Sequence, residues 1–254
     1  MHQARKRFGQ HFLKNPQILL KIVAGMSLKK TDHIIEIGPG LGALTTELLT
    51  QVDHLDVVEL DRDLVLFLQE NFTQHQLTIH SADALKFDFK NLSKNLHDLR
   101  IVGNLPYNIS TPLLFKLFDD LNCIQDMFFM LQKEVVLRLT AKAGDDHYGR
   151  LSVMSQYFCD NDYLFTVPPS AFDPPPKVNS AIVKLTPKKN QLQANNLTML
   201  TDVVREAFNY RRKKLSNALK KYISSAELMV LNINPDSRPE TLTVDEFVKI
   251  ANSR

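Results

Sequence analysis

The chain is poor in the residues that mark several protein classes. It has only two cysteines, Cys123 and Cys159, and no CxxC pair, which excludes a disulfide framework and a cysteine-rich zinc site and fits a reducing cytoplasm. Eight glycines and twelve prolines are too few for a collagen-like or disordered chain. No apolar run approaches the roughly 20 residues of a membrane span, and the basic N-terminus lacks the apolar segment of a secretory signal. The eight histidines show no paired-ligand spacing, so we expect no metal.

Positive charge is gathered in two segments of the chain. Residues 1–31 carry seven basic side chains and no acid, and residues 205–221 carry seven basic side chains and one acid. The rest of the chain has 17 basic and 27 acidic residues, although the net charge of the whole is only +3. Such segregation is typical of proteins that bind a polyanion, so nucleic acid is the partner class that we expect. The alternative is two solvated helix faces.

Short apolar runs alternate with helical patterns over most of the chain. The alternation predicts βαβ units and a parallel sheet covered on both faces. Two late strands have no helix between them and predict an antiparallel pair at the sheet edge. Strands are expected at residues 33–38, 54–60, 77–83, 100–105, 126–132, 162–167 and 178–185.

A polar, unpatterned stretch at residues 186–196 predicts a domain boundary. We therefore expect a catalytic domain at residues 1–186. Residues 187–254 show short helical patterns interrupted by prolines, which predicts a small all-α domain that binds RNA.

A glycine-rich turn with Gly38, Gly40 and Gly42 follows the first predicted strand and opens a helix. Glycines there let the backbone approach a nucleotide-like cofactor, but the spacing differs from the GxGxxG of dinucleotide sites. Glu59 and Asp83 stand at the ends of the next two strands, where their carboxylates can accept hydrogen bonds from a ribose and an adenine amine. The turn and the two acids predict an adenosyl site; the alternative is that both acids only cap helices.

Asn104, Leu105, Pro106 and Tyr107 follow the fourth predicted strand. Here the chain resembles the methyltransferases that use S-adenosylmethionine on adenine N6. The N6 lone pair is delocalised into the ring, so two carbonyl acceptors, from the Asn104 side chain and the Leu105 backbone, would draw the amine toward tetrahedral geometry. Pro106 stiffens the turn, and Tyr107 offers a ring on which the base can stack. Catalysis would be mainly positioning and dipole stabilisation.

Five blocks together are similar to the ribosomal RNA adenine dimethyltransferase family, and within it to the bacterial members that act on small-subunit (16S) rRNA. They span nearly the whole chain in the family's order: residues 6–15, 37–45, 103–110, 171–183 and 208–219. The resemblance implies a class I S-adenosylmethionine-dependent methyltransferase fold, Rossmann-like, with a seven-stranded, mostly parallel sheet and a small all-α C-terminal domain. It also implies dimethylation of N6 on two adjacent adenosines near the 3′ end of 16S rRNA, during ribosome biogenesis in the cytoplasm.

The same resemblance assigns further residues. His11 and Leu13 match cofactor contacts, as do Gly38, Gly40, Glu59, Asp83 and Asn104 at the positions already described. Phe172 matches a second aromatic wall for the flipped base; its alternative is a core phenylalanine that anchors a proline loop. RNA phosphates are expected to meet a basic cluster made of Arg211, Arg212, Lys213 and Lys214.

Two alternatives to 16S dimethylation stay open at this point. A 23S-directed adenine methyltransferase of the macrolide-resistance type shares these motifs and differs mainly in its C-terminal domain. A binding protein that serves ribosome assembly, with methylation secondary, is the other. We expect a monomer whose partner is 16S rRNA in a small subunit or its precursor.

Overall fold

The computed structural model describes residues 11–189 and 191–254, so Arg5, Lys6 and Arg7 of the basic N-terminus, and the first half of the 6–15 block, lie outside the described residues. The chain divides into two compact units. The first holds the described residues up to Val136 together with Asp162–Pro187, and the second holds Leu137–Asn161 and the described residues from Lys188 onward.

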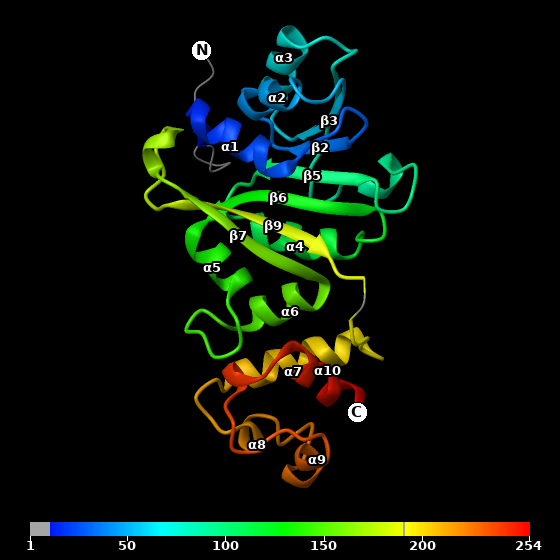
Figure 1. The fold of residues 1–254 in the computed structure, drawn as a ribbon, viewed down its shortest axis with the longest axis vertical. Helices are drawn as coiled ribbons and strands as arrows, with labels where there is room; N and C mark the ends of the chain where they lie inside the picture. Colours follow the sequence, from blue (N-terminus) through cyan, green and yellow to red (C-terminus); the bar gives the residue numbers. More distant parts are fainter. Residues whose placement is uncertain (1–10, 190) are drawn as a thin grey trace. The chain divides into compact units, whose positions relative to one another are not determined.

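A seven-stranded sheet organises the first unit and has the strand order β4-β3-β2-β5-β6-β9-β7 (Figure 1). The adjacent pairs among β2 to β6 run parallel, whereas β9 runs antiparallel to β6. All seven predicted strands are therefore present, and the two late ones are neighbours at one edge, as expected. The strands are β2 (His33–Ile37), β3 (Leu55–Glu59), β4 (Leu77–Ser81), β5 (Leu99–Asn104), β6 (Ile124–Gln132), β7 (Cys159–Val167) and β9 (Ser180–Pro187).

The order of the strands reverses next to β2. From β2 the chain proceeds outward to β3 and β4, then returns to β5 on the other side of β2 and proceeds to β6. In open α/β sheets, ligands bind in the crevice that such a reversal leaves at the carboxyl ends of the strands. The glycine turn after β2 and the asparagine that ends β5 both lie at this point.

Both faces of the sheet are buried. One core cluster takes every second residue of the central strands, among them Ile34, Val57, Val102 and Phe128, and packs them against the helices α1 and α2. The alternate residues, such as Ile35 and Ile101, are equally buried. Continuous apolar strands arise because a parallel sheet is covered on both sides. The helices of this unit are α1 (Pro16–Met26), α2 (Ala43–Leu48), α3 (Arg62–Asn71), α4 (Ser110–Phe118) and the start of α5 (Lys133–Thr140), with a 3₁₀ helix at Phe89–Leu92.

Local capping explains where the helices begin. The Asn15 side chain accepts hydrogen bonds from the backbone N–H groups of Gln17 and Ile18, and Pro16 occupies the first turn of α1. Asp61 caps α3 in the same way, as predicted. At the start of α4 the sequence offers Ser110 or Thr111 as the cap, but Ser110 is already helical and its hydroxyl donates to the Tyr107 carbonyl at 3.1 Å.

A two-stranded antiparallel ribbon was not predicted. It pairs β1 (Phe12–Leu13) with β8 (Phe172–Asp173), which follows a 3₁₀ helix at Pro169–Ala171, so that Leu13 lies opposite Phe172. The two strands are short and about 160 residues apart in sequence, which leaves no local pattern to read.

The second unit is built mainly from helices, with α6 (Arg150–Phe158) and α10 (Val244–Asn252) both against α7 (Leu197–Asn209). The chain crosses between units at Pro187–Lys188, one residue from the expected boundary, but Leu137–Asn161, expected in the catalytic domain, belong to this unit. The reason is that α6 packs on α7. The remaining elements are α8 (Leu215–Ala218), α9 (Ser225–Val230) and a 3₁₀ helix at Pro239–Thr241.

Tyr148 lies in the core of the second unit. The sequence favours a surface-loop aromatic, with a place in the active-site pocket as the alternative, and both are wrong. Its side chain is 1% exposed, and its hydroxyl donates to the Leu242 carbonyl at 2.9 Å. The loop before α6 is therefore anchored by a buried ring.

Candidate functional site

A cavity of about 860 Å³ opens at the carboxyl ends of β2, β3, β4 and β5, entirely within the first unit. It is large enough for a nucleoside-sized cofactor together with part of a second ligand. It collects almost every residue that the sequence marks as a cofactor or catalytic position, namely His11, Leu13, Gly38, Gly40, Glu59, Asp83, Asn104, Leu105, Pro106 and Tyr107.

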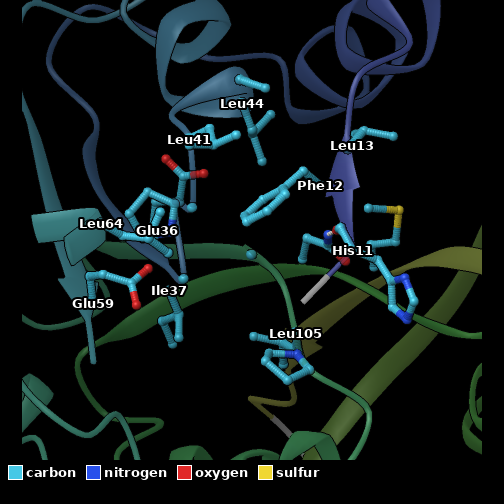
Figure 2. Close-up of a pocket in the computed structure, with 18 of the residues that line it drawn as sticks. His11, Phe12, Leu13, Glu36, Ile37, Leu41, Leu44, Glu59, Leu64 and Leu105 are labelled. Carbon is cyan, nitrogen blue, oxygen red and sulfur yellow. Dashed lines mark hydrogen bonds between the residues drawn. The ribbon is translucent and has the colours of Figure 1, made fainter. Parts of the chain in front are cut away.

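The glycine turn forms one wall of the cavity. Gly38, Gly40 and Gly42 all have positive φ, at 68°, 60° and 76°, a region that residues with a Cβ rarely adopt. A Cβ on Gly40 would lie 3.1 Å from the Phe12 ring, which points into the cavity in Figure 2. A Cβ on Gly42 would lie 2.7 Å from the Phe72 ring, so this glycine serves the packing of α2 against the end of α3.

Glu59 ends β3 with its carboxylate in the cavity and is 7% exposed. Its Oε1 accepts from the Asp61 N–H at 2.8 Å, and the N–H of Gly40 also points to the carboxylate. Burial raises the pKa of Glu59 despite these hydrogen bonds. The acid thus joins the glycine turn to the start of α3 and presents its carboxylate to a ligand.

Asp83 follows β4 and serves a turn as well as the cavity. Its Oδ1 accepts from the Leu85 N–H at 3.0 Å, while the residue lines the cavity. The capping alternative and the ligand interpretation are therefore compatible, because a carboxylate has two oxygens.

Asn104 has its side chain oriented by the N-terminal ribbon. Its Nδ2 donates to the His11 backbone carbonyl at 2.9 Å. Because the amide has one donor end and one acceptor end, this bond engages Nδ2 and leaves Oδ1 as the end that can accept from a ligand. The Leu105 backbone carbonyl accepts no hydrogen bond from the described residues. Two carbonyl acceptors, one from Asn104 and one from Leu105, are thus available at the same edge.

Gly103 brings these acceptors close to the glycine turn. A Cβ at this position would lie 2.5 Å from the Ile37 carbonyl oxygen, which no real Cβ tolerates. β5 can approach the end of β2 so closely only with glycine here. Sequence reasoning did not single out Gly103, although it directly precedes the Asn-Leu-Pro-Tyr motif.

Tyr107 is the aromatic side chain of the motif that lines the cavity. Its hydroxyl forms a hydrogen bond with the Ser180 Oγ at 3.0 Å, and its ring centroid lies 6.0 Å from that of the His11 imidazole. Burial raises the pKa of the Tyr107 phenol, which therefore stays protonated.

The N-terminal ribbon supplies a further wall. His11 Nδ1 lies 2.8 Å from the Pro174 carbonyl oxygen, so this nitrogen carries the proton and donates. Phe12 reaches into the cavity, between Glu36 and Glu59 on one side and His11 on the other (Figure 2). Leu13 lines the cavity and is also part of the core cluster.

Phe172 does not form the second aromatic wall in this structure. It is 2% exposed and belongs to the core cluster, whereas the next residues, Asp173 and Pro174, line the cavity. Phe172 lies opposite Leu13 in the ribbon, and successive side chains of a strand point to opposite sides. Its burial agrees with the alternative interpretation, a core phenylalanine that anchors a proline loop.

Glu36 is a cavity residue that sequence reasoning missed. It is 2% exposed, and its Oε2 accepts from the Thr45 hydroxyl at 2.6 Å. Burial, followed by the nearby Glu59, raises the pKa of Glu36 to about 7, while the Thr45 hydrogen bond opposes the shift. The signal that could have found it is an acid inside the apolar strand at 33–37, directly before the glycine turn.

Comparison with known proteins decides the family. The family model described as ribosomal RNA adenine dimethylase matches residues 1–254. The chain belongs to the ribosomal RNA adenine dimethylase family. Its donor is accordingly S-adenosylmethionine, and its fold is that of a class I methyltransferase.

Relatives of this dimethylase are similar over nearly their whole length. The ribosomal RNA small subunit methyltransferase A of Coxiella burnetii is 59% identical over 250 residues, covering 98% of this chain and 96% of the relative. That of a Marinomonas species is 53% identical over 253 residues, covering 99% and 95%. The crystal structure of a dimethyladenosine transferase from Plasmodium falciparum is similar with a TM-score of 0.81 and 28% identity, covering 94% and 96%. The 23S rRNA methyltransferase ErmE shares the fold, with a TM-score of 0.75 and 22% identity, covering 94% and 98%.

The cavity of the dimethylase fits S-adenosylmethionine in its chemistry. Glu59 and Asp83 offer acceptors to ribose hydroxyls and an adenine amine, and the positive-φ glycines leave room along the backbone. The Glu59 carboxylate gives this side of the cavity an acidic group, which suits a ligand with a sulfonium and an ammonium group.

In the structure, the four cations of the predicted basic cluster fall into two paired and two unpaired side chains among the described residues. Arg211 pairs with Glu240 and donates to the Asp146 carbonyl at 2.9 Å, and Lys214 pairs with Asp236 at 2.9 Å. Arg212 and Lys213 are exposed and form no ion pair with the described residues. Two of the four cations therefore have partners inside the second unit, and two are free to meet a phosphate.

Within the described part of the chain, no group of three His, Cys, Asp or Glu side chains is arranged to hold a metal ion. None of the described helices combines the length and apolar character that a membrane crossing requires.

Proposed function

We propose that the protein transfers methyl groups from S-adenosylmethionine to N6 of two adjacent adenosines near the 3′ end of 16S rRNA, giving N6,N6-dimethyladenosine. The observation that carries this proposal is the pair of carbonyl acceptors at the end of β5. The hydrogen bond from Asn104 Nδ2 to the His11 carbonyl leaves Oδ1 available to accept, and the next residue, Leu105, lines the same cavity.

The residues of this chain act by orientation. The two acceptors each take one N6–H of the flipped adenine, which localises the amine lone pair and directs it away from the ring. Tyr107 stacks on the base, and Pro106 keeps the turn rigid. Water is displaced by the apolar side chains of Phe12 and Leu105. When bound, S-adenosylmethionine supplies a methyl group already activated on a sulfonium.

The proton balance needs no strong base. The adenine amine becomes acidic as it is alkylated, and it can lose its proton through the acceptor pair to solvent. Dipoles fixed before the reaction lower its barrier because they need not reorganise. We therefore assign Asn104 and Leu105 to charge stabilisation, and Glu59, Asp83, His11, Leu13, Gly38 and Gly40 to holding the donor.

Small-subunit rRNA is favoured over 23S rRNA by the relatives. Those that are more than half identical to this chain, across both units, carry small-subunit names. ErmE, at 22% identity, supports only the shared fold. A role as an assembly factor with secondary catalysis is disfavoured because every motif position around the acceptor pair is present.

RNA binding is assigned to the predicted C-terminal domain, residues 187–254, with Arg212 and Lys213 of the second unit as phosphate contacts. We further propose a monomer that works in the cytoplasm, where ribosomal subunits are assembled. Size-exclusion chromatography with light scattering tests the monomer.

The function is tested with unmethylated small subunits and, in parallel, large subunits, each incubated with protein and S-adenosylmethionine. Mass-spectrometric mapping should find dimethyladenosine in two neighbouring positions of 16S rRNA and none in 23S rRNA. Asn104→Ala should lower methyl transfer about a hundredfold or more, as loss of a preorganised electrostatic contact does. Binding of RNA should persist.

The matched control is Asn95→Ala, on an exposed loop before β5, which should methylate as the unaltered protein does. Methyl groups on 23S rRNA alone would overturn the substrate assignment. Full activity of Asn104→Ala would overturn the proposed mechanism.

A further inference from the structure

Tyr107 forms hydrogen bonds both at its backbone and at the far end of its side chain. At its backbone end, the Tyr107 carbonyl accepts from the Ser110 hydroxyl at the start of α4, at 3.1 Å. At its far end, the phenol hydroxyl lies 3.0 Å from the Ser180 Oγ. A tyrosine anchored only at its backbone can rotate about its Cα–Cβ bond, so the contact with Ser180 is what selects one direction for the ring axis.

Ser180 itself is placed by the sheet. It is the first residue of β9, it is 1% exposed, and it lies opposite Gln132 in the antiparallel register with β6. One residue further, the Lys133 N–H donates to the Asn179 carbonyl at 2.9 Å and extends the ladder. The sheet therefore holds the backbone of Ser180 rigidly, and the Ser180 hydroxyl forms its hydrogen bond with the Tyr107 side chain.

Three adjacent strands take part in this arrangement. β5 ends with Asn104, β6 runs beside it with Met130 opposite Asn104, and β9 lies on the far side of β6. Tyr107 follows β5 and reaches Ser180 on β9, so its side chain bridges across the end of β6. These three adjacent strands therefore position both the Tyr107 ring, which faces the base, and the acceptors, which face the amine.

We propose that Ser180 is a positioning residue for methyl transfer: its hydroxyl fixes where the far end of the Tyr107 ring lies, and with it the place where the target adenine stacks beside Asn104. The proposal rests on the proposed function. Reaction rates depend steeply on orientation when catalysis is mainly positioning. A base stacked on a displaced ring would present N6 away from the acceptor pair, although it would still be bound.

The consequence is a specific pattern of mutational effects. Ser180→Ala and Tyr107→Phe each remove one hydroxyl of the same hydrogen bond and leave the aromatic ring in place. Each should lower kcat on small subunits by about tenfold, with a smaller change in KM for the subunit. The double variant should be no slower than the slower single variant, because the second change removes nothing further.

The binding site for S-adenosylmethionine should be unaffected by these substitutions. The affinity for S-adenosylmethionine, measured by calorimetry, should stay within about twofold of the unaltered protein in all three variants. Ser155→Ala, a buried serine of the second unit that does not line the cavity, is the matched control for deletion of a buried hydroxyl, and its kcat should be unchanged. Thermal unfolding of each variant establishes that the protein is folded.

The outcomes separate the positioning proposal from the function. If the unaltered protein does not methylate small subunits, the proposed function fails. If it does, and Ser180→Ala or Tyr107→Phe retains full kcat, the positioning role is overturned. Losses that multiply in the double variant would also overturn it, because they would show two independent effects. An equal loss in Ser155→Ala would assign the effect of Ser180→Ala to stability instead.

Discussion

Among the acids of the cavity, Glu36 has the pKa that burial shifts furthest from its ordinary value. It is enclosed between the sheet and the start of α2, with the Thr45 hydroxyl as its donor at 2.6 Å and Glu59 nearby. Burial raises the pKa of Glu36 from 4.5 to about 7. A proton is therefore bound to this carboxyl in the folded chain at pH values where the unfolded chain has released it.

The pH dependence of stability should reveal this proton. Between the unfolded value of 4.5 and the folded value of about 7, the folded state holds more protons, so the free energy of unfolding contributed by Glu36 decreases as the pH rises. The decrease amounts to roughly 3 kcal/mol at most. Glu36→Gln should remove this part of the pH dependence, which urea unfolding at pH 5, 6, 7 and 8 measures.

The control for Glu36→Gln is Glu70→Gln, an exposed acid on α3, which should leave the pH profile unchanged. If the profiles of Glu36→Gln and the unaltered protein run parallel from pH 5 to 8, the raised pKa is refuted.

At the scale of the elements, the site depends on how closely β5 approaches β2. The acceptors at the end of β5 reach the glycine turn only because Gly103 places no Cβ against the Ile37 carbonyl, where it would lie at 2.5 Å. The ribbon of β1 and β8 then turns the Asn104 amide through the His11 carbonyl. Segments from three parts of the sequence thus meet at one side chain.

Gly103→Ala should lower the free energy of unfolding by about 3 kcal/mol, because the new methyl group meets backbone that cannot move without breaking the sheet. Gly25→Ala is the matched control. A Cβ there would lie 4.0 Å from the Leu164 side chain, inside α1, and the change should stabilise the protein by about 0.5–1 kcal/mol. Chemical denaturation measures both, and equal stability of the two variants would contradict the close-approach argument.

At the scale of the whole molecule, charge and chemistry are divided between two units. The cavity and its acids belong to the first unit, and the cations of residues 205–221 belong to the second. Inside the cationic segment, Arg211 ties the loop at Asp146 to Glu240, whereas Arg212 and Lys213 remain exposed. Neighbouring cations in the sequence therefore have different tasks.

Replacement of Arg212 and Lys213 together by alanine should weaken RNA binding and leave the melting temperature unchanged. The slope of the logarithm of affinity against the logarithm of salt concentration should fall by about 1.4 for single-stranded RNA, which corresponds to two phosphate contacts. Arg211→Ala should lower the melting temperature, because it removes the contacts to Glu240 and Asp146, and should leave the salt slope unchanged. Fluorescence anisotropy and thermal unfolding provide the two readouts. An unchanged salt slope in the double variant would exclude this pair as a phosphate contact.

The sequence was informative wherever a local pattern has one physical cause. Apolar runs that alternate with helical patterns predicted all seven strands of the sheet. Parallel strands end at one edge, so the glycine turn, Glu59, Asp83 and Asn104 could be assigned to one cavity before the structure was known. The short ribbon and the buried Tyr148 had no such pattern, because their partners lie far along the chain.

The sequence by itself determined the strands of the sheet, the strand ends that carry the ligand-facing residues, and the chemistry of the motif that follows β5. Only the tertiary structure decided which end of the Asn104 amide is engaged by the N-terminal ribbon, that Phe172 is buried, that burial raises the pKa of Glu36 and that Arg211 is already paired. The physical reason is that strand and turn formation follow from neighbouring residues, whereas side-chain orientation, burial and pairing depend on atoms brought together from distant parts of the chain.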